Sequence, residues 1–145
     1  LTHLFGNDMR RRGEGKILNV ASIAAFMAGP YMSVYYASKA FVLSFSQAIG
    51  AELRPYGVTV TALCPGPTAT GFEAAANLEN SRMFKLFKPA EASAVARTGY
   101  AAMMKGKTVA FQDFATYSTT VLSRIFPRCM STAVAKYVNS PAKAK

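Results

Sequence analysis

Two side chains one helical turn apart are the leading candidates for chemistry in this sequence. Tyr35 and Lys39 stand at positions i and i+4, which places both on one face of a helix. A free tyrosine has a pKa near ~10, and a nearby ammonium group favours the phenolate and lowers that value. Such a pair can act as a general acid or base. The same spacing also arises where a lysine stem simply lies along an aromatic ring, so the pair alone leaves both interpretations open.

Ser22 is a third candidate, because it directly follows a short apolar run. It stands thirteen residues before Tyr35, and the run at residues 16–21 is typical of a strand buried on both faces. Ligands of open α/β sheets bind at the carboxyl ends of the strands. We therefore expect the Ser22 hydroxyl to lie where it can donate a hydrogen bond to a substrate carbonyl oxygen.

The elements that must position these side chains alternate along the chain. Apolar and β-branched runs predict strands at residues 16–21, 58–63 and 107–111. Helical spacing predicts helices at residues 1–12, 33–53 and 89–104 and a helical tail at 113–139. Gly13 ends the first helix, Pro89 suits the first position of the third, and Pro127 interrupts the tail. This order predicts an α/β fold with one parallel sheet whose first strand is a bare edge.

The strand at 58–63 runs into Pro65-Gly66-Pro67, which no central strand can continue through. Three motifs, taken in order, resemble the second half of a short-chain dehydrogenase/reductase of the single-domain type. They are Asn19-Val20-Ala21-Ser22, the pair Tyr35-x-x-x-Lys39 and the run from Val58 to Thr70. The resemblance is close over residues 1–72, the catalytic-motif segment, and continues over the rest in the order of the elements. It implies that residues 1–145 are the C-terminal part of a Rossmann-like, doubly wound parallel sheet with flanking helices.

The resemblance implies a role for each catalytic candidate. Tyr35 would pass a proton to or from the substrate oxygen. Lys39 would lower the pKa of Tyr35 and hydrogen-bond the ribose hydroxyls beside the nicotinamide, and Ser22 would steady the substrate oxygen. The implied reaction is hydride transfer between NAD or NADP and a small-molecule carbonyl/alcohol substrate.

The resemblance also implies which residues line the nicotinamide. The turn at Pro65 and Gly66 would approach it closely, because glycine has no side chain. Further along, the Thr68 backbone and the Thr70 hydroxyl would lie near its carboxamide. An ordinary strand-ending turn would account for the Pro-Gly pair on its own.

The family's adenine-binding features have no counterpart in the sequence. Gly13-Glu14-Gly15 comes before a strand, so it is not the phosphate-binding loop that follows the family's first strand. Asn7 is too close to Ser22 to be the asparagine of the family's catalytic tetrad. We therefore expect the N-terminal nucleotide-binding half to be missing and the isolated chain to bind cofactor poorly. The alternative is a truncated, non-catalytic fragment that acts as a subunit-pairing or membrane-surface module.

Residues 67–87 stand where the family places a mobile substrate lid. Apolar side chains would line it and favour an apolar or acyl substrate, although core packing explains the same residues: Phe72, Met83, Phe84, Leu86 and Phe87. In the family, the helix that bears the tyrosine and the helix before it commonly form a dimer interface, which implies a homo-oligomer.

The net charge of +10 is concentrated in the second half of the chain. Residues 1–81 carry a net charge of +1, and residues 82–145 carry +9. The basic tail at 113–145 could contact an anionic membrane or an acidic carrier protein, or could be a solvated face of a core-packed helix. Its basic residues are scattered without an aromatic stacking motif, so we expect no nucleic-acid partner.

The cysteines and the apolar runs indicate whether the chain has a metal site or a membrane-spanning helix. Cys64 and Cys129 match no metal spacing, and we expect no metal site and two buried, reduced thiols. No apolar run approaches the roughly 18 to 20 residues of a spanning helix. We expect a cytoplasmic protein whose contact with membranes, if any, is peripheral.

Overall fold

Three parallel strands form the central layer of the protein. In the computed structural model, which describes residues 1–71 and 82–141, β1 (Gly15–Val20) pairs with β2 (Val58–Cys64) and β2 pairs with β5 (Val109–Phe111). The order β1-β2-β5 leaves β1 at an edge of the sheet, as predicted. Because all pairs are parallel, the carboxyl ends of the three strands lie at the same end of the sheet.

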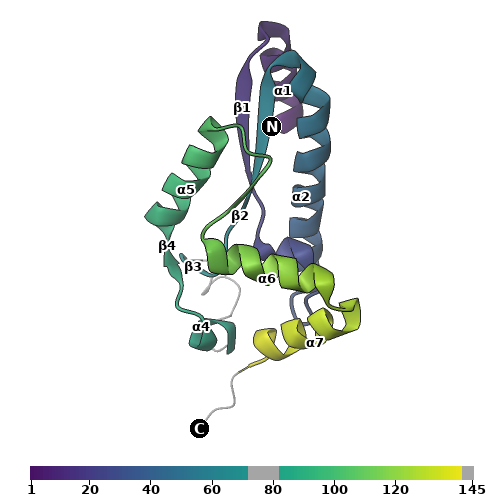
Figure 1. The fold of residues 1–145 in the computed structure, drawn as a ribbon, viewed down its shortest axis with the longest axis vertical. Coiled ribbons are helices and arrows are strands. Elements are labelled where there is room, and N and C mark those ends of the chain that lie inside the picture. Colours follow the sequence, from purple (N-terminus) through teal and green to yellow (C-terminus); the bar gives the residue numbers. More distant parts are fainter. Residues whose placement is uncertain (72–81, 142–145) are drawn as a thin grey trace.

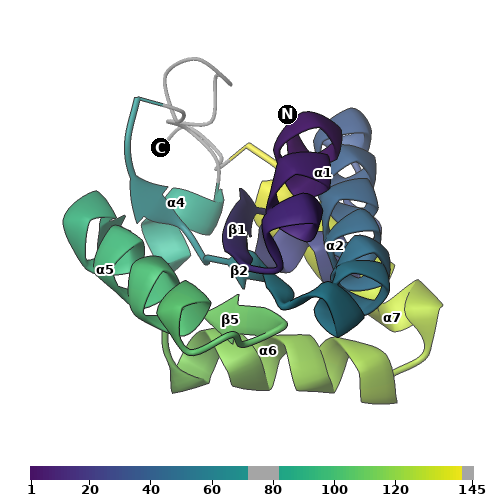
Figure 2. The same ribbon diagram turned by 90° about the horizontal axis from the view of Figure 1, so that it is seen from above.

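Helices cover both faces of this sheet. Figure 2 shows α1 (Thr2–Arg12) and α2 (Ser33–Leu53) on one side and α5 (Ala92–Met104) on the other. Against the first face, Leu53 packs with Val58 and Val60, and against the second, Val95 packs with Leu63. This three-layer arrangement is the predicted α/β class.

The first helix ends as predicted, at a glycine. Gly13 has a φ of 77°, the left-handed conformation that closes helices and that other residues adopt at a cost. Because Gly13 precedes β1 and Gly15 is its first residue, this segment lies at the amino end of the sheet, away from Ser22. That position agrees with the expectation that the segment is not a phosphate-binding loop.

The prediction that a helix begins at Pro89 is wrong. The backbone at Ala90–Glu91 forms a short strand, β4, which pairs with β3 (Thr68–Ala69), and α5 begins only at Ala92. The Ala90 N–H donates to the Pro67 carbonyl at 2.9 Å. This ladder holds the chain extended where proline alone would have allowed a helix. A short helix, α4 (Arg82–Leu86), precedes it.

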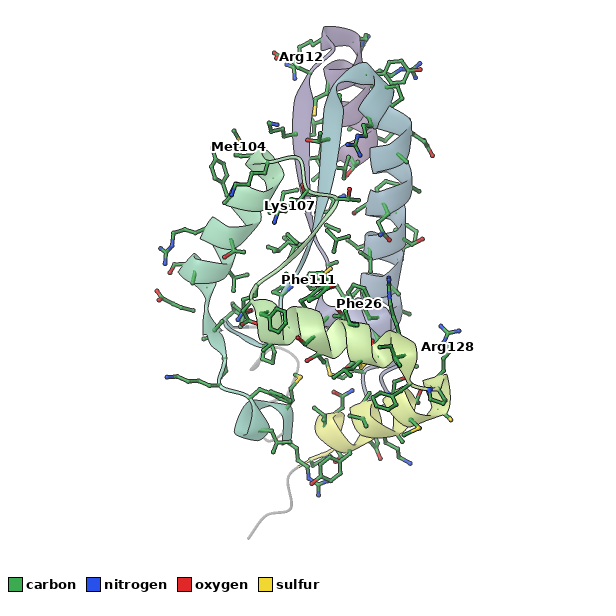
Figure 3. The ribbon with its side chains drawn as sticks, viewed as in Figure 1. Arg12, Phe26, Met104, Lys107, Phe111 and Arg128 are labelled. Carbon is green, nitrogen blue, oxygen red and sulfur yellow. The ribbon has the colours of Figure 1, made fainter. Side chains whose placement is uncertain are left out.

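The tail forms two helices separated at Pro127, as predicted. These are α6 (Phe114–Ile125) and α7 (Arg128–Asn139). Figure 1 shows α6 crossing the end of the sheet where the strands finish. Aromatic rings pack between α6 and this end of the sheet. The ring centroids of Phe26 and Phe111, both labelled in Figure 3, lie 5.8 Å apart. The Phe111 centroid lies 5.4 Å from that of Tyr117 on α6.

The apolar side chains that recur at helical spacing along α2 do not all pack on the sheet. Leu53 is buried against it, but Val34 and Phe41 are 81% and 68% exposed. Leu43 and Ser46 are also buried. The small side chain of Ser46 lets the helix lie close to the strands.

Candidate active site

Ser22 directly follows β1 and begins a short 3₁₀ helix, η1 (Ile23–Phe26). Its Oγ accepts a hydrogen bond from the Ala24 N–H at 3.1 Å, and the residue is 8% exposed. The backbone ladder continues beyond the strand ends, since the Ala21 N–H donates to the Leu63 carbonyl at 2.8 Å and the Ile23 N–H donates to the Pro65 carbonyl at 3.0 Å. Ser22 is therefore held beside the turn that ends β2.

Lys39 connects the helix α2 to the end of β1. Its Nζ donates a hydrogen bond to the Val20 carbonyl at 3.1 Å and lies 5.6 Å from the centroid of the Tyr35 ring. Val20 is two residues before Ser22. The lysine thus contacts both the tyrosine and the backbone that leads into the serine, so the three predicted catalytic residues gather at the carboxyl end of the sheet.

The predicted cofactor-lining segment lies at the same end, directly after β2. Pro65, Gly66 and Thr68 are half-buried, and Thr70 is exposed. The Thr68 hydroxyl donates to the Gly66 carbonyl at 3.0 Å, which tightens the turn, and the Thr68 backbone belongs to β3. A Cβ added at Gly66 would lie 3.4 Å from the Thr116 hydroxyl, so that side of the glycine is already in contact with α6.

Gln112 is a residue that the sequence analysis did not select. It follows β5, and its Oε1 is buried without a hydrogen-bond partner among the described residues, 4.0 Å from the position of a Gly66 Cβ. Its Nε2 donates to Asp113 at 3.1 Å. Its place just after the third strand is the signal that could have found it, because such positions collect at the carboxyl edge. A buried acceptor there suits a ligand that carries an N–H donor.

The two cysteines differ in their surroundings. Cys64 ends β2 and is fully buried, and burial raises the pKa of its thiol to about 11, with the Ser22 backbone N–H acting in the opposite direction. This thiol stays protonated at neutral pH and is no nucleophile. The expectation of a buried thiol is wrong for Cys129, which is exposed because it lies on the outer side of the first turn of α7. In residues 1–71 and 82–141, no three His, Cys, Asp or Glu side chains are grouped to hold a metal ion.

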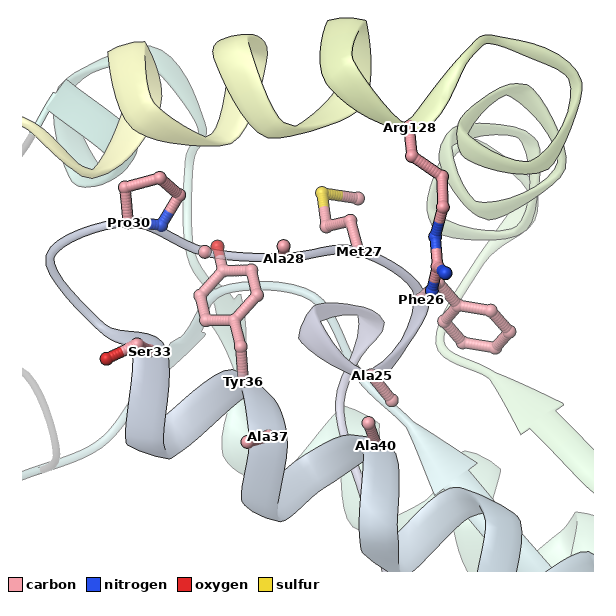
Figure 4. A pocket seen from close by; sticks show the side chains of 11 residues that line it. Ala25, Phe26, Met27, Ala28, Pro30, Ser33, Tyr36, Ala37, Ala40 and Arg128 are labelled. Carbon is pink, nitrogen blue, oxygen red and sulfur yellow. The ribbon is translucent and has the colours of Figure 1, made fainter.

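A pocket of about 440 Å³ opens beside the site but does not include it. Figure 4 shows Tyr36 reaching up from α2 to the loop of Ala28 and Pro30, in the direction of α7. Its hydroxyl donates to Asn139 Oδ1 at 3.1 Å, and Asn139 Nδ2 donates to the Pro30 carbonyl at 3.1 Å. The lining is apolar apart from Ser33, Tyr36 and Arg128, and it contains none of the three predicted catalytic side chains.

The sequence profile of the short chain dehydrogenase family matches residues 1–81, which include all three catalytic candidates and the turn after β2. The chain belongs to the short-chain dehydrogenase family. It is 38% identical over 96 residues to the short-chain reductase protein NovJ of Streptomyces niveus, covering 65% of this chain and 36% of that protein. It is 45% identical over 60 residues to the very-long-chain 3-oxoacyl-CoA reductase of Ajellomyces capsulatus, covering 41% of this chain and 18% of that protein.

A solved short-chain dehydrogenase from Sphingobium yanoikuyae, in complex with NADPH, has the same fold. The TM-score is 0.68 at 26% identity, and the match covers 83% of this chain and 47% of the solved one. The chain therefore spans about half the length of that short-chain dehydrogenase. In the part of the chain that the structure describes, no helix is both long and apolar enough to cross a membrane.

Proposed function

We propose that this chain supplies the catalytic part of an NAD(P)-dependent oxidoreductase acting on a carbonyl/alcohol substrate. The contact of Lys39 with both the Tyr35 ring and the Val20 carbonyl carries this proposal, because it connects the proposed proton-transfer pair to the backbone two residues before Ser22. Membership of the family, and the NADPH complex of the Sphingobium dehydrogenase, support the cofactor class. The match to the family does not favour the alternative of a non-catalytic module.

Each residue of the site has a distinct task in the proposed reaction. The Tyr35 hydroxyl gives a proton to the substrate oxygen during reduction and takes it back during oxidation. The Lys39 ammonium lies 5.6 Å from the centroid of the Tyr35 ring, where it would stabilise negative charge that develops on the phenolic oxygen during proton transfer, and its bond to Val20 holds it there. The Ser22 hydroxyl steadies the substrate oxygen as charge develops on it.

The residues at the carboxyl edge fit the nicotinamide end of NAD or NADP. When bound, the cofactor supplies or accepts the hydride. Lys39 would hold the ribose hydroxyls, since an ammonium has three N–H donors and Val20 engages one of them. Pro65, Gly66, Thr68 and Thr70 would line the nicotinamide. The unpartnered Gln112 acceptor beside Gly66 fits a carboxamide, which carries N–H donors.

The adenine end requires elements that these residues do not provide. We propose that a nucleotide-binding half pairs with the outer edge of β1, which has no strand partner among the described residues. The coverage of the Sphingobium structure, 47% of its length, supports this proposal.

The substrate is proposed to be apolar or acyl. Leu86 and Phe87, in the predicted lid at 67–87, are 58% and 50% exposed, and the name of the Ajellomyces relative specifies an acyl thioester. Residues 72–81 of that predicted lid, with Phe72, lie outside the described residues. A homo-oligomer is proposed through α2, where Phe41 and Phe45 stack at 5.9 Å on the exposed face.

The test compares Tyr35→Phe with Tyr100→Phe in the complete gene product. Tyr100 is an exposed tyrosine on α5, so its substitution is a matched control. With NADPH and a 3-oxoacyl thioester, Tyr35→Phe is expected to lower kcat by about 10²-fold or more, because the proton donor is lost, while cofactor binding measured by fluorescence is retained. Turnover of Tyr35→Phe within a few-fold of the control would refute the assigned mechanism.

A further inference from the structure

The helix α6 turns its large apolar side chains outward, apart from Tyr117, whose ring packs on Phe111. Phe114 and Ile125 are 80% and 72% exposed, and Leu122 is half exposed. The side that faces the body carries Thr116 and Thr120, which are 8% and 2% exposed. A surface helix normally buries its apolar side and exposes its hydroxyls. This helix does the reverse, so its outer side is adapted to something other than water.

The helix α7 also leaves large apolar side chains exposed. Ala135 and Asn139 are buried against the body, whereas Met130, Val134 and Tyr137 are between 51% and 61% exposed. These three are spaced at i, i+4 and i+7, so they form one apolar stripe. Scattered exposed apolar residues are ordinary, but a stripe on each of two adjoining helices is typical of an interaction surface.

The charge around these stripes has one sign. Residues 114–145 contain five Lys or Arg and no Asp or Glu. Arg124 and Lys136 are exposed on the two helices, with the Arg124 guanidinium 5.3 Å from the Phe26 ring centroid, and Arg128 is exposed while also lining the pocket. Arg82 stacks on the Tyr137 ring at 4.4 Å from its centroid. The nearest acidic residue in sequence, Asp113, caps the start of α6 by accepting from the Thr116 N–H. The partner must therefore be both apolar and anionic.

We propose that the outer faces of α6 and α7 bind the surface of an anionic lipid bilayer. The apolar stripes would enter the boundary between headgroups and acyl chains, and the cations would contact the anionic headgroups. A second copy of the chain is a poorer occupant. A symmetric contact brings each patch against itself, which would oppose cations to cations with no carboxylate between them.

The test measures co-sedimentation of the chain with vesicles. Vesicles of phosphatidylserine mixed with phosphatidylcholine are expected to retain the chain, vesicles of phosphatidylcholine alone are expected to retain little, and added salt should weaken the binding. The variant Phe114→Ser/Ile125→Ser is expected to bind about tenfold more weakly. The variant Arg124→Gln/Lys136→Gln should bind about 25-fold more weakly, from a factor of about five for each cation near the surface.

The helix α5 offers matched controls. Tyr100→Ser/Met104→Ser removes exposed apolar groups, and Arg97→Gln/Lys105→Gln removes exposed cations, both outside the proposed surface. Circular dichroism verifies that each variant is folded. Equal binding to the two kinds of vesicle, or equal losses from the α5 and the α6–α7 variants, would overturn the proposal. So would self-association that the α6–α7 substitutions abolish while no vesicle binding occurs.

Discussion

The buried hydrogen bond between Tyr36 and Asn139 should stabilise the fold measurably. It joins α2 to the last turn of α7, across 103 residues of sequence, and Asn139 extends the connection to the Pro30 carbonyl. Tyr36 and Asn139 are 8% and 4% exposed. Burial raises the pKa of the Tyr36 hydroxyl, so it remains a protonated donor at neutral pH.

The expected magnitudes follow from what each substitution leaves behind. Tyr36→Phe leaves the Asn139 oxygen buried without its donor and should lower the free energy of unfolding by about 1–3 kcal/mol. Asn139→Ala removes the partner of both Tyr36 and Pro30 and should cost about 2–3 kcal/mol. Since the bond can be lost only once, the double variant should be less destabilised than the sum, by about 1 kcal/mol.

Urea unfolding of the four proteins, followed by circular dichroism, measures this cycle. The exposed Tyr100→Phe serves as a control and should change the free energy of unfolding by less than about 0.5 kcal/mol. Because the pKa of Tyr36 is raised in the folded state, its contribution to the free energy of unfolding is present below pH ~10 and is lost as the pH rises through the folded-state pKa. The Tyr36→Phe variant should lack this fall in stability. Additivity of the two single variants to within about 0.3 kcal/mol would refute the reasoning.

Two further predictions concern a thiol and a helix cap. Under native conditions an alkylating reagent should modify Cys129 and spare Cys64, as mass spectrometry would show, because Cys64 is fully buried with its pKa raised to about 11; equal modification of both would contradict this. Asp113→Ala should destabilise the chain by about 1 kcal/mol in thermal or urea unfolding, because the carboxylate caps α6. The Thr116 N–H lowers the Asp113 pKa, so this contribution is present above pH ~4 and is lost as the pH falls through the lowered value; an effect that did not weaken in acid would count against it.

The contact between Tyr35 and Lys39, the proposed catalytic pair, was predictable because its geometry is local. A spacing of four residues on a helix fixes the relation of Tyr35 to Lys39 before any tertiary structure is known. Ser22 was predictable because a buried strand with a turn after it ends at a definite edge of the sheet. The contact between Lys39 and the Val20 carbonyl then follows from packing this helix beside that strand.

The features that sequence reasoning missed depend on partners far along the chain. The β4 strand at Ala90–Glu91 exists because β3 lies beside it, and nothing near Pro89 indicates that pairing. Gln112 acquires its buried, unpartnered oxygen only where the ends of β2 and β5 meet. Periodicity also aligns apolar residues along a helix but does not say which of them will be covered, and on α2 Phe41 is exposed whereas Leu53 is buried.

The proposed lipid surface and the proposed active site lie at the same end of the molecule. The helix α6 crosses the end of the sheet where Ser22 and the Pro65 turn are held (Figure 1), and α7 is tied through Asn139 to the residue next to Tyr35. An apolar substrate is concentrated in a bilayer, so an enzyme that lies on the bilayer with its active end downward would meet that substrate over a short path. The exposed apolar side chains of α6 and α7 and the proposal of an apolar substrate thus support each other. A strictly water-soluble substrate would gain nothing from an enzyme placed on the bilayer.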